Sequence, residues 1–429
     1  MEFEAPTLLY GAGREGKSTF RFIKSRNPGA RIYVATDKDD SDIEGAEFAP
    51  AADVKKWLAD GEFGLVVKSP GVPLSHPAME AARQAGVPVT SNINLWGDAF
   101  RAGKTLLAIT GTKGKSTSAT LLAGMLNQSG IRTGLGGNVG VPPLELGNDY
   151  GTVVFELSSF QTANLSFSPD FAAITSLYPE HLDWHGSPEQ YIADKTRLLR
   201  LEPLAKVALG PQAAVHPGLD FIRAAVDRQI PDLDRGAEEE IEDAVLSSRL
   251  KGRHNFHNCV LAARMAFAAG ANLDGILTAI AEFEPLPHRL QEFYEGGVTF
   301  VDDSIATTPE ATKAALAAYA GQRIALIAGG YDRGQDFSEL GAMLWQSGVT
   351  VLAALPDNGD RIARAALSAA PDLPVIAAPD LKSAMRSLAD RTGSYDVVVL
   401  SPGAPSFNQF KDFADRGLQF RMFAAEFFG

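Results

Sequence analysis

The chain has 429 residues, 45% of them hydrophobic and 21% charged, so it can bury several cores and is expected to form about three domains. Its 39 basic and 52 acidic residues give a net charge of −13, which argues against sequence-independent nucleic-acid binding. The single cysteine, Cys259, excludes an internal disulfide and a cysteine zinc site and fits the reducing cytoplasm, where we expect the protein to act. The sequence lacks a signal-peptide pattern and any apolar run of about 18 residues, so no membrane insertion is expected.

Short apolar runs alternate with segments of helical period along the whole chain. This alternation predicts an α/β fold in which helices cover parallel sheets. The pattern restarts near Trp96–Gly103 and near Pro285–His288, which predicts domains at residues 1–97, 98–287 and 288–429. In chain order, the predicted buried strands are residues 7–10, 31–36, 64–69, 87–90, 106–110, 152–157, 171–177, 298–304, 323–330, 350–355, 373–378 and 396–403.

A Gly-rich turn, GAGREGKST from Gly11, follows the first predicted strand and opens a helix. Its GxGxxG pattern, with Asp37 about 20 residues further on, is typical of a dinucleotide fingerprint. The same letters also fit a Walker A loop ending at Ser18, but no acid at a strand end follows at a suitable distance. We therefore expect this first loop to bind a diphosphate of the substrate, with a tight turn that binds no ligand as the alternative.

A second Gly-rich turn, TGTKGKSTS from Thr110, follows the strand at 106–110 and opens another helix. Its Walker match is imperfect, because Ile109 stands where the motif has glycine. Its context is better than that of the first loop, since Glu156 ends a later strand and can complete a metal shell. We expect ATP at Lys113–Thr117, with Lys115 on phosphate and Ser116 on Mg²⁺.

The segment SLYPEHLDWHGSPEQYIADKTRL, from Ser176, has the highest density of candidate functional side chains. His181 is favoured as a metal ligand over a purely hydrogen-bonding role, although Mg²⁺ prefers oxygen ligands. For Asp183 and His185 the two roles stay equally open. Lys195, taken by itself, indicates a surface lysine. Asn258 lies inside a predicted helix, where capping does not explain it.

Motifs spread over the whole chain resemble those of the Mur ligases of peptidoglycan synthesis. They are GTKGKST, ELSSFQ, EHLDWHG, KGRHNFHN, HRLQEF, DDSIATTPEAT and SPGAPSFNQFKDFADRG. The resemblance implies a Rossmann-like N-terminal domain, a central P-loop ATPase-type α/β domain and a Rossmann-like C-terminal domain. It also implies an ATP-dependent ligase that adds glutamate to UDP-N-acetylmuramoyl-L-alanine through an acyl phosphate. A monomer without a nucleic-acid partner is expected.

The resemblance also implies roles for individual residues. Lys115, His181 and Lys195 would be catalytic, with His181 or a nearby carboxylate assisting loss of the amine proton. The cofactors would be ATP and two Mg²⁺ ions, with Lys195 carbamylated into a carboxylate-like anion. The implied contacts are Gly13, Arg14, Glu15, Asp37, Ser69, Pro70, Gly71, Asn138 and Ser159 for the UDP substrate; Gly111, Thr112, Lys113, Gly114, Lys115, Ser116, Thr117, Asn258, Arg289 and Asp303 for ATP; Ser116, Glu156, His181 and Lys195 for metal; and Thr307, Arg333, Ser406 and Phe413 for glutamate.

Three departures from the family pattern bear on the choice of amino acid. Ile305 and Arg333 stand where lysines are usual, and the segment from Thr90 reads TSNINLW in place of an acidic stretch. These changes resemble a variant subgroup that adds L-glutamate, which is the alternative substrate. D-glutamate is the favoured substrate.

Other functions fit less of the sequence. An NAD-dependent oxidoreductase would leave the second loop unexplained, and a folylpolyglutamate-type ligase would lack the N-terminal loop domain. A non-catalytic nucleotide-binding regulator would not need Lys115, Glu156 and Lys195.

Overall fold

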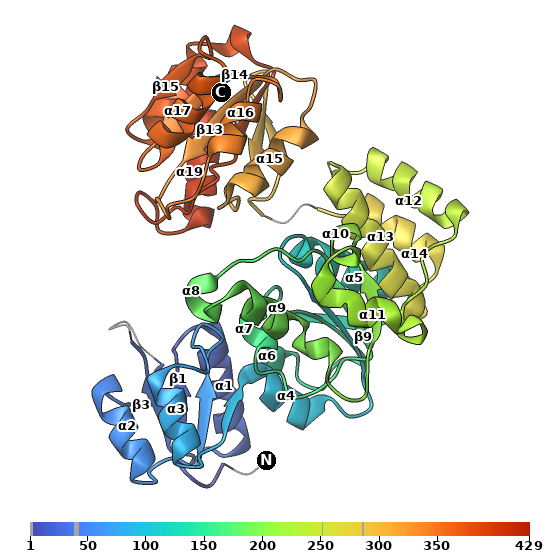
Figure 1. Ribbon diagram of the computed structural model, residues 1–429, viewed down its shortest axis with the longest axis vertical. Coiled ribbons are helices and arrows are strands. Elements are labelled where there is room, and N and C mark those ends of the chain that lie inside the picture. The colour runs from blue at the N-terminus through green and yellow to red at the C-terminus, as the bar shows by residue number, and fades with distance from the viewer. Residues whose placement is uncertain (1–2, 38–42, 251, 285–286) are drawn as a thin grey trace. The chain divides into compact units, whose positions relative to one another are not determined.

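The computed structural model describes residues 3–37, 43–250, 252–284 and 287–429, and it divides into two compact units (Figure 1). Unit 1 comprises Met1–Ser247 with Phe256–Glu282, and unit 2 comprises Ser248–Asn255 with Phe283–Gly429. Unit 1 contains two five-stranded sheets and unit 2 contains one six-stranded sheet. Residues 285 and 286 of the predicted boundary at Pro285–His288 lie outside the described residues.

The first sheet of unit 1 is parallel, with the order β3-β2-β1-β4-β5. Successive side chains of its central strand point to opposite faces, so Leu8 and Leu9 enter different hydrophobic cores. Apolar residues on both faces are therefore covered by helices. The elements are β1 (Thr7–Tyr10), α1 (Arg14–Arg26), β2 (Ile32–Ala35), β3 (Glu47–Phe48), α2 (Ala51–Ala59), β4 (Leu65–Lys68), α3 (Pro77–Gln84), β5 (Val89–Ser91) and α4 (Asn92–Phe100).

The second sheet of unit 1 is also parallel, with the order β10-β9-β6-β8-β7. Its strands are β6 (Thr105–Thr110), β7 (Thr133–Gly137), β8 (Thr152–Glu156), β9 (Phe171–Ile174) and β10 (Lys206–Leu209). Its helices are α5 (Lys115–Gln128), α6 (Pro143–Leu146), α7 (Ser159–Thr162), α8 (Leu182–His185), α9 (Pro188–Thr196), α10 (Pro211–Ala214), α11 (Asp220–Ala224), α12 (Arg235–Ser247), α13 (Arg253–Ala268) and α14 (Leu273–Ala281), with short 3-10 turns at Arg197–Leu199, Pro217–Leu219 and Val226–Arg228.

The two sheets of unit 1 are joined through α4. Trp96 is fully buried and meets Phe155 of β8 edge to face, with 4.7 Å between ring centroids. Asn92, at the start of α4, donates from Nδ2 to the Glu15 carbonyl (3.1 Å), and its Oδ1 accepts the backbone N–H of Leu144 (3.2 Å). These bonds connect α1, which follows the first loop, to α6 beside the second sheet.

Asn92→Ala is expected to destabilise unit 1 by about 1–3 kcal/mol, because it leaves the buried Leu144 N–H without an acceptor. Urea unfolding would measure the loss as a lower midpoint. The matched control is Asn148→Ala, an exposed position where the expected change is within about 0.5 kcal/mol. Equal midpoints for the two variants would contradict the structural role of Asn92.

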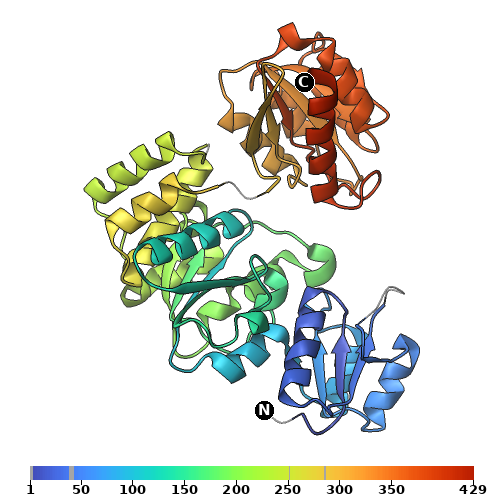
Figure 2. The same cartoon turned by 180° about the vertical axis from the view of Figure 1, so that it is seen from behind.

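The sheet of unit 2 has the order β11-β12-β16-β13-β14-β15, and its edge strand β11 is antiparallel to β12. Leu326 and Ile327 of β13 enter separate cores on its two faces. Figure 2 shows α19 lying along one face. The elements are β11 (Gln291–Glu295), β12 (Val298–Asp302), α15 (Pro309–Ala318), β13 (Ile324–Gly329), α16 (Ser338–Met343), β14 (Val349–Leu355), α17 (Gly359–Ala369), β15 (Val375–Ala377), α18 (Leu381–Ala389), a 3-10 turn at Thr392–Ser394, β16 (Val397–Leu400) and α19 (Phe413–Phe428).

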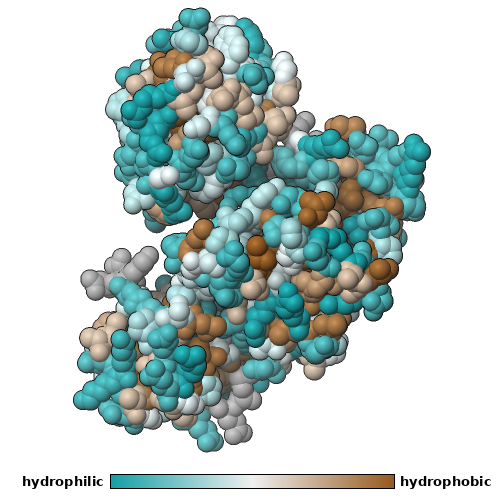
Figure 3. All heavy atoms as spheres, in the orientation of Figure 1, coloured by the Kyte–Doolittle hydropathy of each residue, from teal (hydrophilic) through white to brown (hydrophobic). Residues whose placement is uncertain are grey.

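Hydrophilic side chains cover much of the face in Figure 3. Within the described ranges, every helix is too short or too polar to cross a membrane.

Candidate active site

The carboxyl ends of the parallel strands carry most of the predicted site residues. In α/β sheets this edge is where ligands bind, because loops and helix N-termini gather there. The first sheet places Gly11–Gly16, Asp37 and Ser69–Gly71 at its edge. The second places Gly111–Gly114, Asn138 and Glu156 there, and the sheet of unit 2 places the loops after β12, β13 and β16 there.

The first Gly-rich loop is a tight turn between β1 and α1. Gly11 has a φ of +109°, and a Cβ there would meet Ser69 Oγ at 2.4 Å, so the close approach of β4 requires glycine. Asp37 accepts a hydrogen bond from the Tyr10 hydroxyl (2.6 Å) and lies 3.3 Å from His76 Nε2. Arg14 is exposed and reaches the Gly140 carbonyl (2.5 Å). The loop thus keeps the open backbone of an anion site, and Gly13 has nothing within 4 Å of an added Cβ.

Glu15 points away from the first loop and into the contact between the two sheets. Its Oε1 accepts from Gln161 Nε2 of α7 (2.7 Å), while its Oε2 is buried without a hydrogen-bond partner among the described residues. Burial raises the pKa of this carboxyl to about 7, and burial lowers the pKa of the nearby Lys68 amine to about 8. Glu15 therefore links the two sheets, and its expected contact with the UDP substrate stays a prediction.

The second Gly-rich loop has the backbone that close packing against β9 requires. Gly111 has a φ of +142°, and a Cβ there would meet Thr175 Oγ1 at 2.0 Å; Gly114 has a φ of +87° and would meet Asn258 Oδ1 at 2.4 Å. Lys115 begins α5 and donates to the Thr112 carbonyl (2.8 Å). This places an ammonium group at a helix N-terminus, an arrangement that binds phosphate.

Glu156 is completely buried and lies against the start of α5. Its Oε2 accepts a hydrogen bond from Ser116 Oγ (3.2 Å), and Asn138 Nδ2 lies 3.2 and 3.3 Å from its two oxygens. A serine hydroxyl beside a carboxylate supplies the oxygen ligands that Mg²⁺ prefers. The pair predicted from sequence is thus close in space, and it fits an ion that keeps water and phosphate as its other ligands.

The expectation that Lys195, taken by itself, is a surface lysine is wrong, because the side chain is only 2% exposed. Its Nζ donates to the Gly111 carbonyl (2.6 Å) and lies 4.9 Å from the ring centroid of Tyr191. Burial, followed by the positive charge of Lys115, lowers its pKa well below the usual value. The periodicity of α9 does not reveal this, because the residue is buried by the phosphate loop and not by a helix–sheet core.

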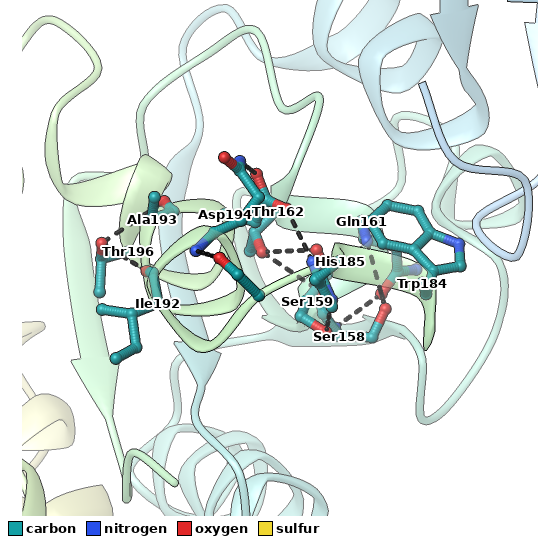
Figure 4. A network of polar contacts seen from close by, with 12 residues as sticks. Ser158, Ser159, Gln161, Thr162, Trp184, His185, Ile192, Ala193, Asp194 and Thr196 are labelled. Carbon is teal, nitrogen blue, oxygen red and sulfur yellow. Dashed lines mark hydrogen bonds and ion pairs between the residues drawn. The ribbon is translucent and has the colours of Figure 1, made fainter. Parts of the chain in front are cut away.

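His181 and His185 have different environments. His181 has a left-handed backbone, packs its ring at a tilt against Phe160 (4.9 Å between centroids), and has its pKa lowered by burial. His185 has both ring nitrogens engaged, Nδ1 with Asp194 Oδ2 (2.7 Å) and Nε2 with Ser159 Oγ (3.0 Å), as Figure 4 shows. This settles the question left open for His185 in favour of hydrogen bonding.

No cluster of three or more His, Cys, Asp or Glu side chains able to hold a metal is found in the part of the chain that the structure describes. A metal bound at Ser116 and Glu156 would therefore depend on non-protein ligands. This suits Mg²⁺, which usually retains several waters and binds substrate phosphates.

Unit 2 brings together some of its predicted residues. Asp303 is buried beside Arg289; it accepts from Ser401 Oγ (2.7 Å), and burial raises its pKa to about 7. Arg289 Nε is buried with no hydrogen-bond partner among the described residues. Asn258 belongs to unit 1, so its joint role with this pair on ATP stays a prediction.

The four residues expected to bind glutamate lie on loops that follow strands of the unit 2 sheet. Thr307 follows β12, and its carbonyl accepts from Gln335 (3.2 Å). Arg333 is exposed after β13, Ser406 is buried after β16, and Phe413 begins α19. Gathering at one sheet edge is compatible with a shared pocket, which stays a prediction.

The sequence did not predict that Asp194 and Lys68 lie beside the site residues. Asp194 lies next to Lys195 in α9 but bonds to His185, and Lys68 ends β4 under the first loop. A lysine ending an otherwise apolar strand was the available signal for Lys68. No sequence pattern indicated that Asp194 bonds to His185.

Comparisons with known proteins agree with this arrangement. The model of the Mur ligase middle domain matches residues 109–212, and that of the Mur ligase glutamate ligase domain matches residues 288–403. The chain is 37% identical to a UDP-N-acetylmuramoyl-L-alanine–L-glutamate ligase of a Micromonospora species, over 95% of this chain and 94% of that relative. It is 35% identical to the enzyme of the same name from Xanthomonas axonopodis pv. citri, over 97% and 94%.

Solved structures share the fold. The UDP-N-acetylmuramate–alanine ligase MurC of Thermotoga maritima matches with a TM-score of 0.59 and 17% identity, covering 97% of this chain and 98% of that one. MurF of Thermotoga maritima, solved in complex with ADP, matches with a TM-score of 0.57 and 15% identity over 100% and 96%. Together with the sequence relatives, these matches show that the chain belongs to the Mur ligase family.

Proposed function

We propose that this protein catalyses the ATP-dependent addition of glutamate to UDP-N-acetylmuramoyl-L-alanine, a step in the synthesis of peptidoglycan precursors. The observation that carries the proposal is the position of the β8–α7 segment between two phosphate-type loops. Glu156 at its start contacts Ser116 of the second loop, and Gln161 near its end contacts Glu15 of the first. A UDP-sugar on one loop and ATP on the other would bring a carboxylate and a γ-phosphate to this segment. We expect the enzyme to act in the cytoplasm as a monomer.

The geometry of the second loop supports ATP and Mg²⁺ as its ligands. Lys113–Thr117 and Lys115 would hold the ATP phosphates, and Ser116 with Glu156 would hold Mg²⁺. When bound, Mg²⁺ supplies positive charge that offsets the negative charge developing on the transferred phosphoryl group. Lys115 acts on the same charge from the helix side. The ADP complex of the MurF relative supports a nucleotide here.

The state of Lys195 decides whether a second Mg²⁺ fits. As an ammonium group it would repel the ion. Burial lowers its pKa and so favours the neutral amine, and a neutral amine can add to CO₂. The nitrogen loses one proton in that reaction, and the carbamate that forms is an anion. We infer that Lys195 is carbamylated in the active enzyme and would join His181 as a protein ligand of the second ion.

The ligation needs activation because a carboxylate is a poor electrophile. Transfer of the γ-phosphoryl group converts it to an acyl phosphate, which has a good leaving group. The amine of glutamate then attacks the acyl carbon, and inorganic phosphate leaves as the amide forms. Contacts between the two sheets of unit 1, such as Asn92 with Glu15 and Leu144, keep the two loops in fixed register for this transfer.

The preferred enantiomer of glutamate changes from D, favoured by the sequence, to L. The sequence-based preference was D-glutamate, although the departures at Ile305 and Arg333 resemble the subgroup that adds L-glutamate, and the two relatives described above are named L-glutamate ligases. We therefore propose L-glutamate as the substrate. Arg333 is exposed and can bind a carboxylate through two parallel hydrogen bonds, which a lysine cannot do.

Phosphate release with each glutamate enantiomer tests this proposal. The purified full chain would be mixed with ATP, Mg²⁺ and UDP-N-acetylmuramoyl-L-alanine, and release is expected with L-glutamate at a rate at least about tenfold above that with D-glutamate, which corresponds to about 1.4 kcal/mol of discrimination. Faster release with D-glutamate would restore the preference drawn from the sequence. No release with either enantiomer would reject the ligase.

A further inference from the structure

Ser159, His185 and Asp194 form a chain of hydrogen bonds in unit 1 that no step above uses. The Nδ1 atom of His185 lies 2.7 Å from Asp194 Oδ2, and its Nε2 atom lies 3.0 Å from Ser159 Oγ. In Figure 4, His185 of α8 lies with Ser159 of α7 and Asp194 of α9 in one network. Three separate elements therefore contribute to a serine–histidine–carboxylate arrangement.

The hydrogen bonds determine which atoms carry protons. An ionised carboxylate can only accept, so Asp194 requires a hydrogen on Nδ1 of His185. In the neutral imidazole, Nε2 is then an acceptor, and the Ser159 hydroxyl must donate to it. Gln190 Nε2 donates to the other carboxylate oxygen, Asp194 Oδ1 (2.8 Å), and so supports the accepting role of Asp194.

Aromatic side chains enclose the imidazole and isolate it from water. The side chain of His185 has no solvent exposure, and the rings of Phe160, Trp184 and Tyr191 lie 5.7, 4.4 and 5.2 Å from it between centroids. His185 cannot touch a substrate directly through this shell. The hydroxyl of Ser159 is its one polar link on the Nε2 side among the described residues.

Ser159 lies on the segment between the two loops, where the reacting groups of the proposed ligation would meet. In the chain it stands between Glu156, which contacts the second loop, and Gln161, which contacts the first. Lys195 follows Asp194 in α9 and reaches the Gly111 carbonyl (2.6 Å), so the relay borders the phosphate loop. A group attacking an acyl phosphate formed between the loops would approach this part of α7.

We propose that Ser159 receives the proton released by the attacking amine while its own hydroxyl proton passes to Nε2 of His185, which Asp194 holds in the accepting tautomer. This inference rests on the proposed ligase function. Ser159 is then a catalytic residue, and His185 and Asp194 are positioning residues that act through it.

The step balances in atoms and charge. The nitrogen of the amine forms a bond to the acyl carbon, and the bond from that carbon to the phosphate oxygen breaks. One N–H proton moves to Ser159 Oγ, and the Oγ–H proton moves to His185, giving an imidazolium paired with Asp194. The proton returns through Ser159 to the departing phosphate before the next turnover. No oxidant or further reactant is needed.

Single-turnover kinetics can separate the two halves of the reaction. The full chain would be mixed with ATP, Mg²⁺, UDP-N-acetylmuramoyl-L-alanine and L-glutamate, with ADP and amide product followed separately. In Ser159→Ala and His185→Gln, ADP formation is expected within about threefold of wild type, while amide formation falls by about 100-fold, as for loss of a general base. His185→Gln keeps an acceptor for Ser159 but has no basic nitrogen.

Hydroxylamine in place of glutamate gives an independent readout. It attacks acyl phosphates in its neutral form at pH 7 and needs less help in losing a proton, so the two variants should form hydroxamate at near wild-type rates. The matched control is Glu189→Ala, an exposed position of α9 outside the relay, which should leave both half-reactions unchanged.

Several outcomes would overturn the relay. Equal losses of ADP and amide formation, or slow hydroxamate formation, would assign the three residues a purely structural role. Unchanged amide formation in both variants would reject it directly. If wild-type protein forms no ADP with these substrates, the proposed function fails instead, and the two failures are therefore distinguishable.

Discussion

Lys195→Met is expected to abolish ligation and at the same time to raise the stability of the fold. The lysine is 2% exposed and its pKa is lowered by burial. A lysine whose pKa falls on folding destabilises the native state at every pH below its unfolded pKa, and the cost grows as the pH falls towards the folded pKa. Methionine has a similar shape and no charge, so this cost disappears.

The expected loss of activity has a separate cause, because methionine cannot form the carbamate that we propose at Lys195. Loss of a metal ligand removes several kcal/mol of transition-state stabilisation, about a thousandfold or more in kcat. Steady-state kinetics and the urea midpoint would be measured together, with the exposed Lys55→Met as control. Near-normal activity would exclude the metal-binding role, and a lowered midpoint would contradict the buried-charge argument.

Lys115→Ala is expected to lower kcat by about a thousandfold through loss of phosphoryl transfer. The ammonium group begins α5 and lies beside the Gly-rich backbone of the second loop, where under the proposed function it would neutralise charge on the γ-phosphate. Lys115 is only partly buried, so the unfolding free energy should change by less than about 1 kcal/mol.

The defect should appear in the first half-reaction. ADP formation in a single turnover measures it, and the result should be a slow rate with amide formation limited by the same step. Lys55→Ala is the control for loss of an exposed lysine. ADP formation at the wild-type rate would remove Lys115 from the phosphate site.

Most strands that are apolar on both faces were predicted from the sequence, although the short edge strand β10 was missed. Runs such as 106–110 and 396–403 are confirmed as β6 and β16, because strands covered by helices on both sides must be continuously hydrophobic. Strand β7 reads TGLGG and was missed, since glycines that admit Glu156, Tyr150 and Leu146 give no apolar signal. The edge strand β11 was missed because its side chains alternate in exposure.

The site was predictable where its residues stand at the ends of predicted strands. The Gly-rich loops and the Ser116–Glu156 pair lie at strand ends, and parallel strands in register bring such ends together. The burial of Lys195 and the Ser159–His185–Asp194 chain could not be predicted this way. They depend on how α7, α8 and α9 pack, and sequence spacing does not specify that packing.

Gln161 makes two hydrogen bonds that connect the two loops, and we expect them to couple ligand binding at one loop to binding at the other. Its Oε1 caps α7 by accepting the Ser158 N–H (2.9 Å), and its Nε2 holds Glu15 beside the first loop (2.7 Å). A substrate that binds more tightly when this hydrogen bond is made must strengthen the bond by the same factor, because coupling free energies are reciprocal. Since α7 closely follows Glu156, we expect occupancy of the first loop to change the affinity of the second loop for nucleotide.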